Sequence, residues 1–277
     1  MAYYVAFDIG GTFIEYALLQ DEGTIINKAK VETPHSLNEL YQVLTHIVNA
    51  FKQTHHIEGI AISAPGAVDS DTGIIKGASA LPYIHGPNIK TDLEKLTNLR
   101  VEIENDANCA ALAEVWLGNA KNTKDAMFVV IGTGIGGAII KDRKIHRGVH
   151  LHGGEFGYTV QEFDSSTLTF KTWSDIGSTN ALVQNVAKQL KCHLSGEEIF
   201  ERAKTDEICK KAVEDFYFHL AIGIYNLQYV YDPEVIIIGG GISNQPQLVD
   251  EINKRLDTIL DKIKIAKIKP NVMTCAF

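Results

Sequence analysis

One pattern occurs twice in this chain: an apolar segment, a glycine-rich turn, and a second apolar segment that resumes at once. The first copy spans residues 4–19 around a turn at residues 10–12, and the second spans residues 127–140 around a turn at residues 132–137. In P-loops and dinucleotide-binding motifs a helix follows the glycines, whereas β-branched and apolar residues follow them here. We therefore predict two β-hairpins whose backbone N–H groups approach phosphate oxygens, because glycine has no Cβ to keep a ligand away. Two such hairpins suggest two similar halves that close on one polyphosphate.

The composition is typical of a soluble two-domain enzyme. With 277 residues the chain exceeds the length at which single cores usually stop growing, so two domains and a large core are expected. Its formal net charge is −8, and no basic run occurs, which argues against nucleic acid or an anionic membrane as the main partner. The N-terminus lacks a signal-peptide pattern and no apolar run is long enough to span a bilayer, so we expect a cytoplasmic protein.

The four cysteines lie far apart and form no C-x-x-C pair, which predicts neither a disulfide framework nor a zinc knuckle. They are Cys109, Cys192, Cys209 and Cys275. We interpret them as reduced, mostly buried thiols.

Strands and helices alternate along the first part of the chain, as in α/β proteins. After the first hairpin we expect a third strand over residues 24–33, and Ser36 with Glu39 forms a capping-box pattern before an amphipathic helix. Further strands are expected over residues 59–63 and 99–103. The second of these ends at Asn105-Asp106, before a helix of small residues, and open α/β sheets usually bind ligands at such a strand-to-helix switch.

The second part repeats this layout with longer helices. We predict helices over residues 176–190 and 207–231, and Ser195 with Glu198 forms another capping-box pattern. An apolar strand over residues 234–238 then leads into three glycines and a helix from about Pro246. No Pro- or Ser-rich linker separates the parts, so we expect an N-terminal α/β domain of residues 1–106 and a C-terminal α/β domain of residues 107–277.

Six motifs in this order resemble those of the ROK family of sugar kinases. They are residues 8–12, 63–69, 105–108, 131–137, 152–157 and 238–241. The resemblance covers nearly the whole chain. It implies an α/β, two-domain fold of the actin/hexokinase/Hsp70-like ATPase type, with a ligand cleft between the domains. It also implies ATP and Mg²⁺ as cofactors, a sugar as substrate, and phosphoryl transfer to a sugar hydroxyl.

The resemblance assigns Asp106 as the general base that takes the proton of the acceptor hydroxyl. The alternative is that Asp106 only caps its helix. Asn105 and Glu155 are expected to hydrogen-bond sugar hydroxyls, with Gly66 and Tyr158 also at the substrate; a lone Gly-Gly-Glu would otherwise be a surface turn.

Nucleotide binding is assigned to three glycine segments and one carboxylate. Asp8 is expected to lie near Mg²⁺ and to reach it through water, because Mg²⁺ keeps part of its hydration shell. The other cofactor-binding residues are Ile9, Gly10, Gly11 and Thr12 of the first turn, Gly132, Thr133, Gly134, Ile135 and Gly136 of the second, and Gly239, Gly240 and Gly241 on the adenosine side. For any single glycine the alternative is an ordinary tight turn.

The chain also departs from the family pattern. Many members bind structural zinc through a Glu-x-Gly-His segment and a cysteine-rich segment, whereas here the first ends in Tyr158 and the second is deleted near residues 172–178. We therefore expect no zinc site. Ala80 stands where an Asn typically precedes Leu-Pro in the sugar-binding loop. The family normally continues through a final helix beyond Phe277, so we expect the present sequence to stop short of it.

These departures bear on the acceptor. In relatives that phosphorylate free hexoses, the missing His and a Glu contact the sugar near its anomeric end, and here Tyr158 and Ser174 take those positions. The opened volume would admit a second ring, with Tyr158, Trp173 or Tyr83 as apolar faces. We therefore predict transfer to the 6-hydroxyl of a β-glucoside such as cellobiose, with glucokinase or N-acetylmannosamine kinase as the alternative.

Two other classes of function remain open. One is a sugar-responsive transcriptional regulator, although only two residues precede the first predicted strand, so we do not expect an N-terminal helix-turn-helix that reads DNA. The other is a chaperone-like or acyl-phosphate-forming user of the same ATPase fold. Direct nucleic-acid binding is not expected, no membrane partner is expected, and a homodimer is a further possibility.

Overall fold

The computed structural model describes residues 2–277, and the chain divides into two compact units. The division falls after Ala110, within helix α3 (Asp106–Trp116). Each unit contains one five-stranded sheet. Among the described residues, no helix is long and apolar enough to cross a membrane.

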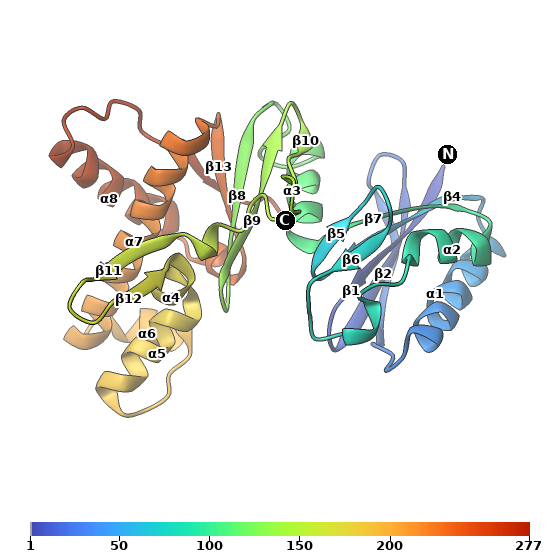
Figure 1. Cartoon of the computed structure of the whole chain (residues 1–277), viewed down its shortest axis with the longest axis horizontal. Coiled ribbons are helices and arrows are strands. Elements are labelled where there is room, and N and C mark those ends of the chain that lie inside the picture. The colour runs from blue at the N-terminus through green and yellow to red at the C-terminus, as the bar shows by residue number, and fades with distance from the viewer. Residues whose placement is uncertain (1) are drawn as a thin grey trace. The chain divides into compact units, whose positions relative to one another are not determined.

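The sheet of the first unit has the strand order β3-β2-β1-β4-β7. Its strands are β1 (Tyr3–Ile9), β2 (Phe13–Gln20), β3 (Ile25–Glu32), β4 (Ile57–Ala64) and β7 (Arg100–Asn105). Strands β1, β2 and β3 pair antiparallel, whereas β4 and β7 extend the sheet in parallel. Helices α1 (Leu37–Lys52) and α2 (Ile89–Thr97) cover one face (Figure 1) and bury the apolar side chains of β1 and β4. A short hairpin, β5 (Ala67–Asp69) and β6 (Ile74–Lys76), and a 3-10 turn, η1 (Pro82–Ile84), complete the unit.

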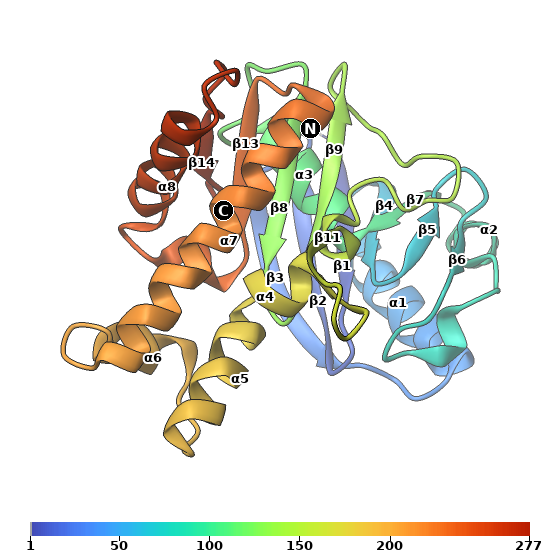
Figure 2. The same ribbon diagram turned by 60° about the vertical axis from the view of Figure 1, so that its left-hand side comes forward.

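The sheet of the second unit has the order β10-β9-β8-β13-β14. Its strands are β8 (Ala126–Ile131), β9 (Ile135–Lys141), β10 (Lys144–Ile145), β13 (Val235–Gly239) and β14 (Val272–Thr274). Helix α7 (Glu207–Tyr231) crosses one face of this sheet (Figure 2), and α8 (Leu248–Lys262) packs beside it. Ala111 and Val115 of α3 pack on the opposite face.

The other helices of this unit precede α7. They are α4 (Trp173–Gly177), α5 (Thr179–Leu190) and α6 (Gly196–Arg202). Before them come a 3-10 turn, η2 (Phe156–Tyr158), and a two-stranded hairpin, β11 (Val160–Asp164) and β12 (Thr169–Thr172). After β13 the chain forms a last 3-10 turn, η3 (Gly241–Asn244).

The two sheets share one topology, which confirms the two similar halves predicted from the repeated hairpin. In each, an antiparallel hairpin closes around the glycine turn, and two further strands add in parallel on the side of its first strand. Strand β1 therefore corresponds to β8, and β4 to β13. The glycine turn follows the carboxyl end of β1 in the first sheet and of β8 in the second. The carboxyl ends of β4 and β13 lie next to these two strand ends.

Two predicted helix features are wrong in detail. The single helix over residues 176–190 is two helices, because Ser178 has an extended backbone and its side chain caps α5 by accepting from the Ala181 N–H at 3.0 Å. At α1, Ser36 accepts from the Glu39 N–H, but the Glu39 carboxylate accepts from the His35 N–H instead of that of Ser36. The Ser195–Glu198 capping box of α6 is confirmed in both directions.

Candidate functional site

The first glycine turn joins β1 to β2 and leaves two adjacent amides unpaired. The Gly10 N–H donates to the Phe13 carbonyl at 3.0 Å, and Thr33 ties the turn to β3 through the carbonyls of Gly10 and Thr12, at 2.7 and 3.0 Å. Within residues 2–277 nothing accepts from the N–H groups of Gly11 and Thr12, and both residues are exposed. Such adjacent free amides form an anion-binding concavity.

The second turn joins β8 to β9 in the same way. The Gly132 N–H donates to the Gly134 carbonyl at 2.9 Å, and the Ile135 N–H donates to Ser174 Oγ at 2.9 Å. The N–H groups of Thr133 and Gly134 have no partner in the described part of the chain, and both residues are exposed. Each hairpin therefore presents one pair of free amides, as the sequence pattern predicted.

None of the glycines in either turn has a positive φ, so the backbone conformation does not by itself require glycine there. A Cβ added at Gly132 or Gly136 would meet no protein atom within 4 Å. The space beside them is therefore open to a ligand.

Gly240 differs from these turn glycines, because it has a φ of 89° and packs against the end of β8. A Cβ added there would lie 2.2 Å from the Ile131 carbonyl oxygen. This contact brings Gly241 and Gly132 to the rim of one cavity of about 620 Å³. Its other lining residues come mainly from α5, the start of α6 and η3, and they include Thr179, Asn180, Gln184, Glu197, Phe200 and Asn244.

Asp8, Glu104 and Asp106 lie at the carboxyl ends of β1 and β7 in the first unit. Asp8 and Ser63 are register partners on β1 and β4, and Ser63 Oγ donates to Asp8 Oδ1 at 2.7 Å. Burial raises the pKa of the nearby Cys109 thiol to about 12, and the charges of Glu104, Asp8 and Asp106 act in the same direction. Asp8 Oδ2 has no protein partner among residues 2–277 and fits a water-mediated contact to Mg²⁺, which prefers oxygen ligands.

Asn105 caps helix α3 and Asp106 does not. Asn105 Oδ1 accepts from the N–H groups of Ala107 and Asn108 at 3.0 and 3.2 Å, and its Nδ2 donates to the Gly66 carbonyl at 3.0 Å. Asp106 accepts from the Ala107 N–H through Oδ1 alone, at 2.8 Å, and the residue is exposed. The second oxygen of Asp106 is therefore available to a substrate hydroxyl.

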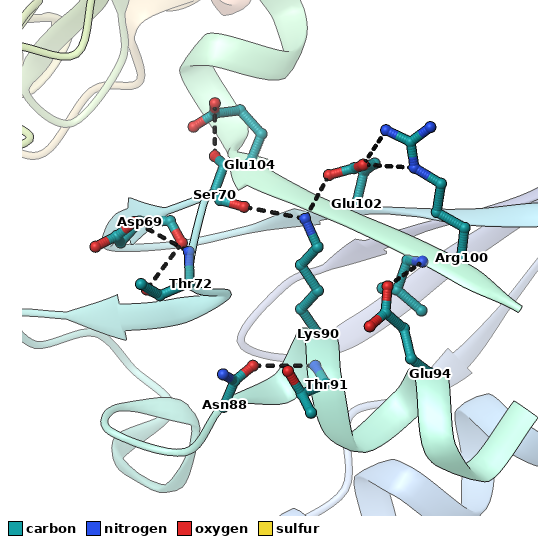
Figure 3. Close-up of polar contacts among 11 residues, drawn as sticks. Asp69, Ser70, Thr72, Asn88, Lys90, Thr91, Glu94, Arg100, Glu102 and Glu104 are labelled. Carbon is teal, nitrogen blue, oxygen red and sulfur yellow. Dashed lines mark hydrogen bonds and ion pairs between the residues drawn. The ribbon is translucent and has the colours of Figure 1, made fainter. Parts of the chain in front are cut away.

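Glu104 is a residue of this site that the sequence did not reveal. Only 7% of it is exposed, yet its carboxylate accepts from the Asn105 N–H at 2.9 Å, from Asn108 Nδ2 at 3.0 Å and from Ser70 Oγ at 2.9 Å. Figure 3 shows Ser70 between this carboxylate and Lys90, whose Nζ lies 3.3 Å from the Ser70 carbonyl oxygen. The network fixes the strand-to-helix junction that carries Asp106.

Glu155 and Tyr158 lie on a loop that packs against β9. A Cβ on Gly154 would lie 2.5 Å from the Gly137 carbonyl oxygen, and one on Gly157 would lie 2.0 Å from that of Ile135. The loop backbone is thus held beside the second turn, while the side chains of Glu155 and Tyr158 stay exposed, Tyr158 at 71%.

The structure excludes Trp173, one of the aromatic residues suggested for the sugar. Trp173 is 1% exposed and packs in the core against Gly177 and Gly223, so it offers no face to a ligand. Trp173 also begins helix α4. This helix lies within residues 172–178, where the cysteine-rich segment of the family is deleted. The Tyr83 hydroxyl donates to the Pro34 carbonyl within the first unit.

The cysteines are all free thiols, but their exposure differs. Cys209 is buried, Cys109 and Cys275 are half-buried and Cys192 is exposed, so the expectation of mostly buried thiols is wrong. Within residues 2–277 no group of three or more His, Cys, Asp and Glu side chains is placed to hold a metal ion.

Comparison with known proteins extends over nearly the whole chain. The sequence model of the ROK family matches residues 4–272. A beta-glucoside kinase of Listeria innocua is 36% identical over 267 residues, which cover 92% of this chain and 90% of that protein. A glucokinase of Halalkalibacterium halodurans is 31% identical over 289 residues, covering 95% and 84%. The crystal structure of a ROK family protein from Streptococcus pneumoniae TIGR4 in complex with sucrose is 36% identical, with a TM-score of 0.90, and the match covers 99% of this chain and 93% of that one.

Proposed function

Because the chain belongs to the ROK family and is a carbohydrate kinase, we propose that it transfers the γ-phosphoryl group of ATP to the 6-hydroxyl of a β-glucoside such as cellobiose. It has the actin/hexokinase-like ATPase fold of the solved ROK sugar kinases. The similarity to a beta-glucoside kinase supports the choice of acceptor class, and the geometry of the site supports the roles below.

The four free amides of the two glycine turns would bind phosphate oxygens, and the cavity beside Gly132 and Gly241 would take the adenosine. Mg²⁺ bound to the phosphates would supply positive charge for the transferred group, with Asp8 holding it through water. These residues position the donor, which is the main protein contribution to a loose phosphoryl-transfer transition state.

Asp106 would accept the proton of the acceptor hydroxyl as the new P–O bond forms. Its free carboxylate oxygen and its exposure suit that role, and Asn105 already supplies the helix cap. A positioned general base typically contributes about 10²- to 10⁴-fold to the rate. Asn105 has one Nδ2 hydrogen left for a sugar oxygen after its bond to Gly66.

One observation carries the choice of a glycoside over a free sugar: the exposed Tyr158 ring beside Glu155, with the Ser174 hydroxyl turned away to Ile135. No polar side chain is then dedicated to an anomeric hydroxyl at these two positions, and an aromatic face is free for a second ring. The pneumococcal relative was crystallised with sucrose, a disaccharide whose glucose carries a second ring at its anomeric carbon.

The test is a comparison of kcat/KM for cellobiose, glucose and N-acetylmannosamine, because these ratios measure differential transition-state binding. We expect the highest value for cellobiose, with ³¹P and ¹³C NMR placing the phosphate on C6 of the non-reducing ring. Replacing Tyr158 by Ala should lower kcat/KM for cellobiose more than for glucose. A clear preference for either monosaccharide would contradict the glycoside assignment and leave a glucokinase or N-acetylmannosamine kinase.

A further inference from the structure

We propose that Ser174 is a positioning residue that holds the second glycine turn in its phosphate-binding shape. The proposal rests on the function proposed above for that turn. Ser174 lies on α4, 39 residues beyond Ile135 in the chain, yet its hydroxyl contacts the first residue after the turn.

The contact replaces a missing neighbouring strand. In an antiparallel ladder, hydrogen-bonded pairs alternate with pairs that are not hydrogen-bonded. The Gly132 N–H donates to the Gly134 carbonyl, so the next pair, Ile131–Ile135, is not hydrogen-bonded. The N–H and C=O of Ile135 therefore point away from β8. On that outer side, β9 has a strand partner only at Ile140 and Lys141, where β10 pairs. Ser174 Oγ therefore accepts from the Ile135 N–H at 2.9 Å and donates to the Ile135 carbonyl at 3.4 Å, so that one hydroxyl satisfies both groups.

The hydroxyl is itself held rigidly. Thr172 and Asp175 form a reciprocal capping box at the start of α4, and the buried Trp173 anchors this helix in the core. A rigid hydroxyl fixes the Ile135 backbone, and therefore the direction of the free amides at Thr133 and Gly134.

Two glycines bring their backbone close to the Ser174 hydroxyl. A Cβ on Gly157 would lie 2.3 Å from Ser174 Oγ, and one on Gly134 would lie 3.5 Å from it. Ser174 is thus enclosed between the glycine turn and the loop that carries Glu155. Loss of its hydroxyl would leave the Ile135 N–H without an acceptor on this outer side.

The experiment compares Ser174→Ala, Ser174→Thr and a matched control, Ser166→Ala, whose hydroxyl bonds only within the β11–β12 turn. Two quantities are measured in the full-length protein: the exchange rate of the Ile135 amide by NMR without ligand, and the affinity for the ATP analogue AMP-PNP with Mg²⁺ by calorimetry. Steady-state KM values for ATP and for cellobiose are added.

For Ser174→Ala we expect Ile135 amide exchange to be about tenfold faster, since a buried donor loses its acceptor. We expect AMP-PNP affinity to fall and KM for ATP to rise by about tenfold, with KM for cellobiose changed less than about twofold. Ser174→Thr keeps the hydroxyl and should restore both values, and Ser166→Ala should change neither.

Equal AMP-PNP affinity in the wild-type protein and Ser174→Ala would overturn the inference while leaving the proposed function intact. Parallel losses toward ATP and cellobiose would also overturn it, because they indicate a general structural defect. A wild-type protein that does not bind AMP-PNP would instead contradict the proposed function, and the inference with it.

Discussion

Asn105 and Asp106 are neighbours with opposite tasks. The Asn105 side chain caps α3 and bonds to Gly66, which leaves one Nδ2 hydrogen, whereas Asp106 keeps one carboxylate oxygen free. The same dipeptide therefore contains the helix cap and the residue that we propose as the general base. Substitutions at the two positions should separate these roles.

We predict that Asp106→Asn lowers kcat by about 10²- to 10⁴-fold, because the proton acceptor is lost. AMP-PNP affinity and the midpoint of thermal unfolding should stay close to those of the wild-type protein. The measurements are steady-state kinetics, calorimetry and thermal denaturation, and a kcat within a few fold of wild type would exclude Asp106 as the base.

The adjacent substitution provides the control. Asn105→Ala should reduce the free energy of unfolding by about 0.5–2 kcal/mol, because two N–H groups of α3 lose their cap. If Asp106→Asn destabilised the protein as much as Asn105→Ala, the capping assignment would be reversed.

The thiols allow a second test at the scale of single residues. Burial raises the pKa of Cys109 to about 12, and Cys192 is exposed. Since the thiolate is the nucleophile, iodoacetamide at pH 8 should label Cys192 well before Cys109. Mass spectrometry of peptides during the time course measures this order, and early labelling of Cys109 would contradict its burial and its raised pKa.

At the scale of elements, some glycines lie beside open space and others pack closely against a neighbouring strand. Gly132 faces open space in the second hairpin, whereas Gly240 packs against the end of β8 with a positive φ. The first kind leaves space for the phosphate that we propose, and the second kind allows β13 to approach β8 closely.

We predict that Gly132→Ala leaves the folded protein nearly as stable as wild type but weakens AMP-PNP binding at least about tenfold. A methyl group there would interfere with charge-assisted amide–phosphate hydrogen bonds, each worth roughly 1.5–3 kcal/mol. Calorimetry and urea denaturation measure the two effects. Unchanged AMP-PNP affinity would mean that this turn is only a hairpin connection.

Gly240→Ala is the matched comparison. It should destabilise the second unit by roughly 1–3 kcal/mol from backbone strain, with overlap against the Ile131 carbonyl adding to that cost. A fully stable Gly240→Ala protein would contradict the packing described for β13 and β8.

At the scale of the whole molecule, each unit contains thiol or phenol groups whose pKa is raised by burial. Burial raises the pKa of Cys109 in the first unit to about 12, and it raises those of Tyr217 and Tyr231 in the second to about 12. In the unfolded chain these groups have ordinary values near 9.0 for Cys and 10.0 for Tyr. The unfolded state therefore releases its protons first as the pH rises.

The contribution of these protonated groups to the free energy of unfolding should consequently be complete below about pH 9. The free energy of unfolding should then fall between pH 9 and 12. Urea denaturation at pH 7.5, 9 and 10.5 measures the trend. Cys109→Ala should show a smaller decrease in the unfolding free energy over this range than wild type does. A flat profile in the wild-type protein would contradict the pKa directions assigned to these groups.

Much of the fold was predictable because its signals are local. Apolar runs broken by glycines identified both hairpins, and α7 and the cap of α6 followed from helical spacing and a Ser-x-x-Glu pattern. The break at Ser178 was missed because the apolar spacing continues across it, whereas in the structure Ser178 is extended and caps α5.

The sequence by itself determined the repeated hairpins, their glycine turns and the position of Asn105-Asp106 at a strand end, because each depends on neighbours in the chain. Only the tertiary structure decided that Glu104 is buried, that Trp173 belongs to the core and that Ser174 bonds to Ile135. These contacts join residues from different elements, and a polar side chain has no local pattern that reveals a distant partner. Whether such a side chain serves a ligand or the fold therefore depends on which hydrogen-bonding groups the packing brings to it.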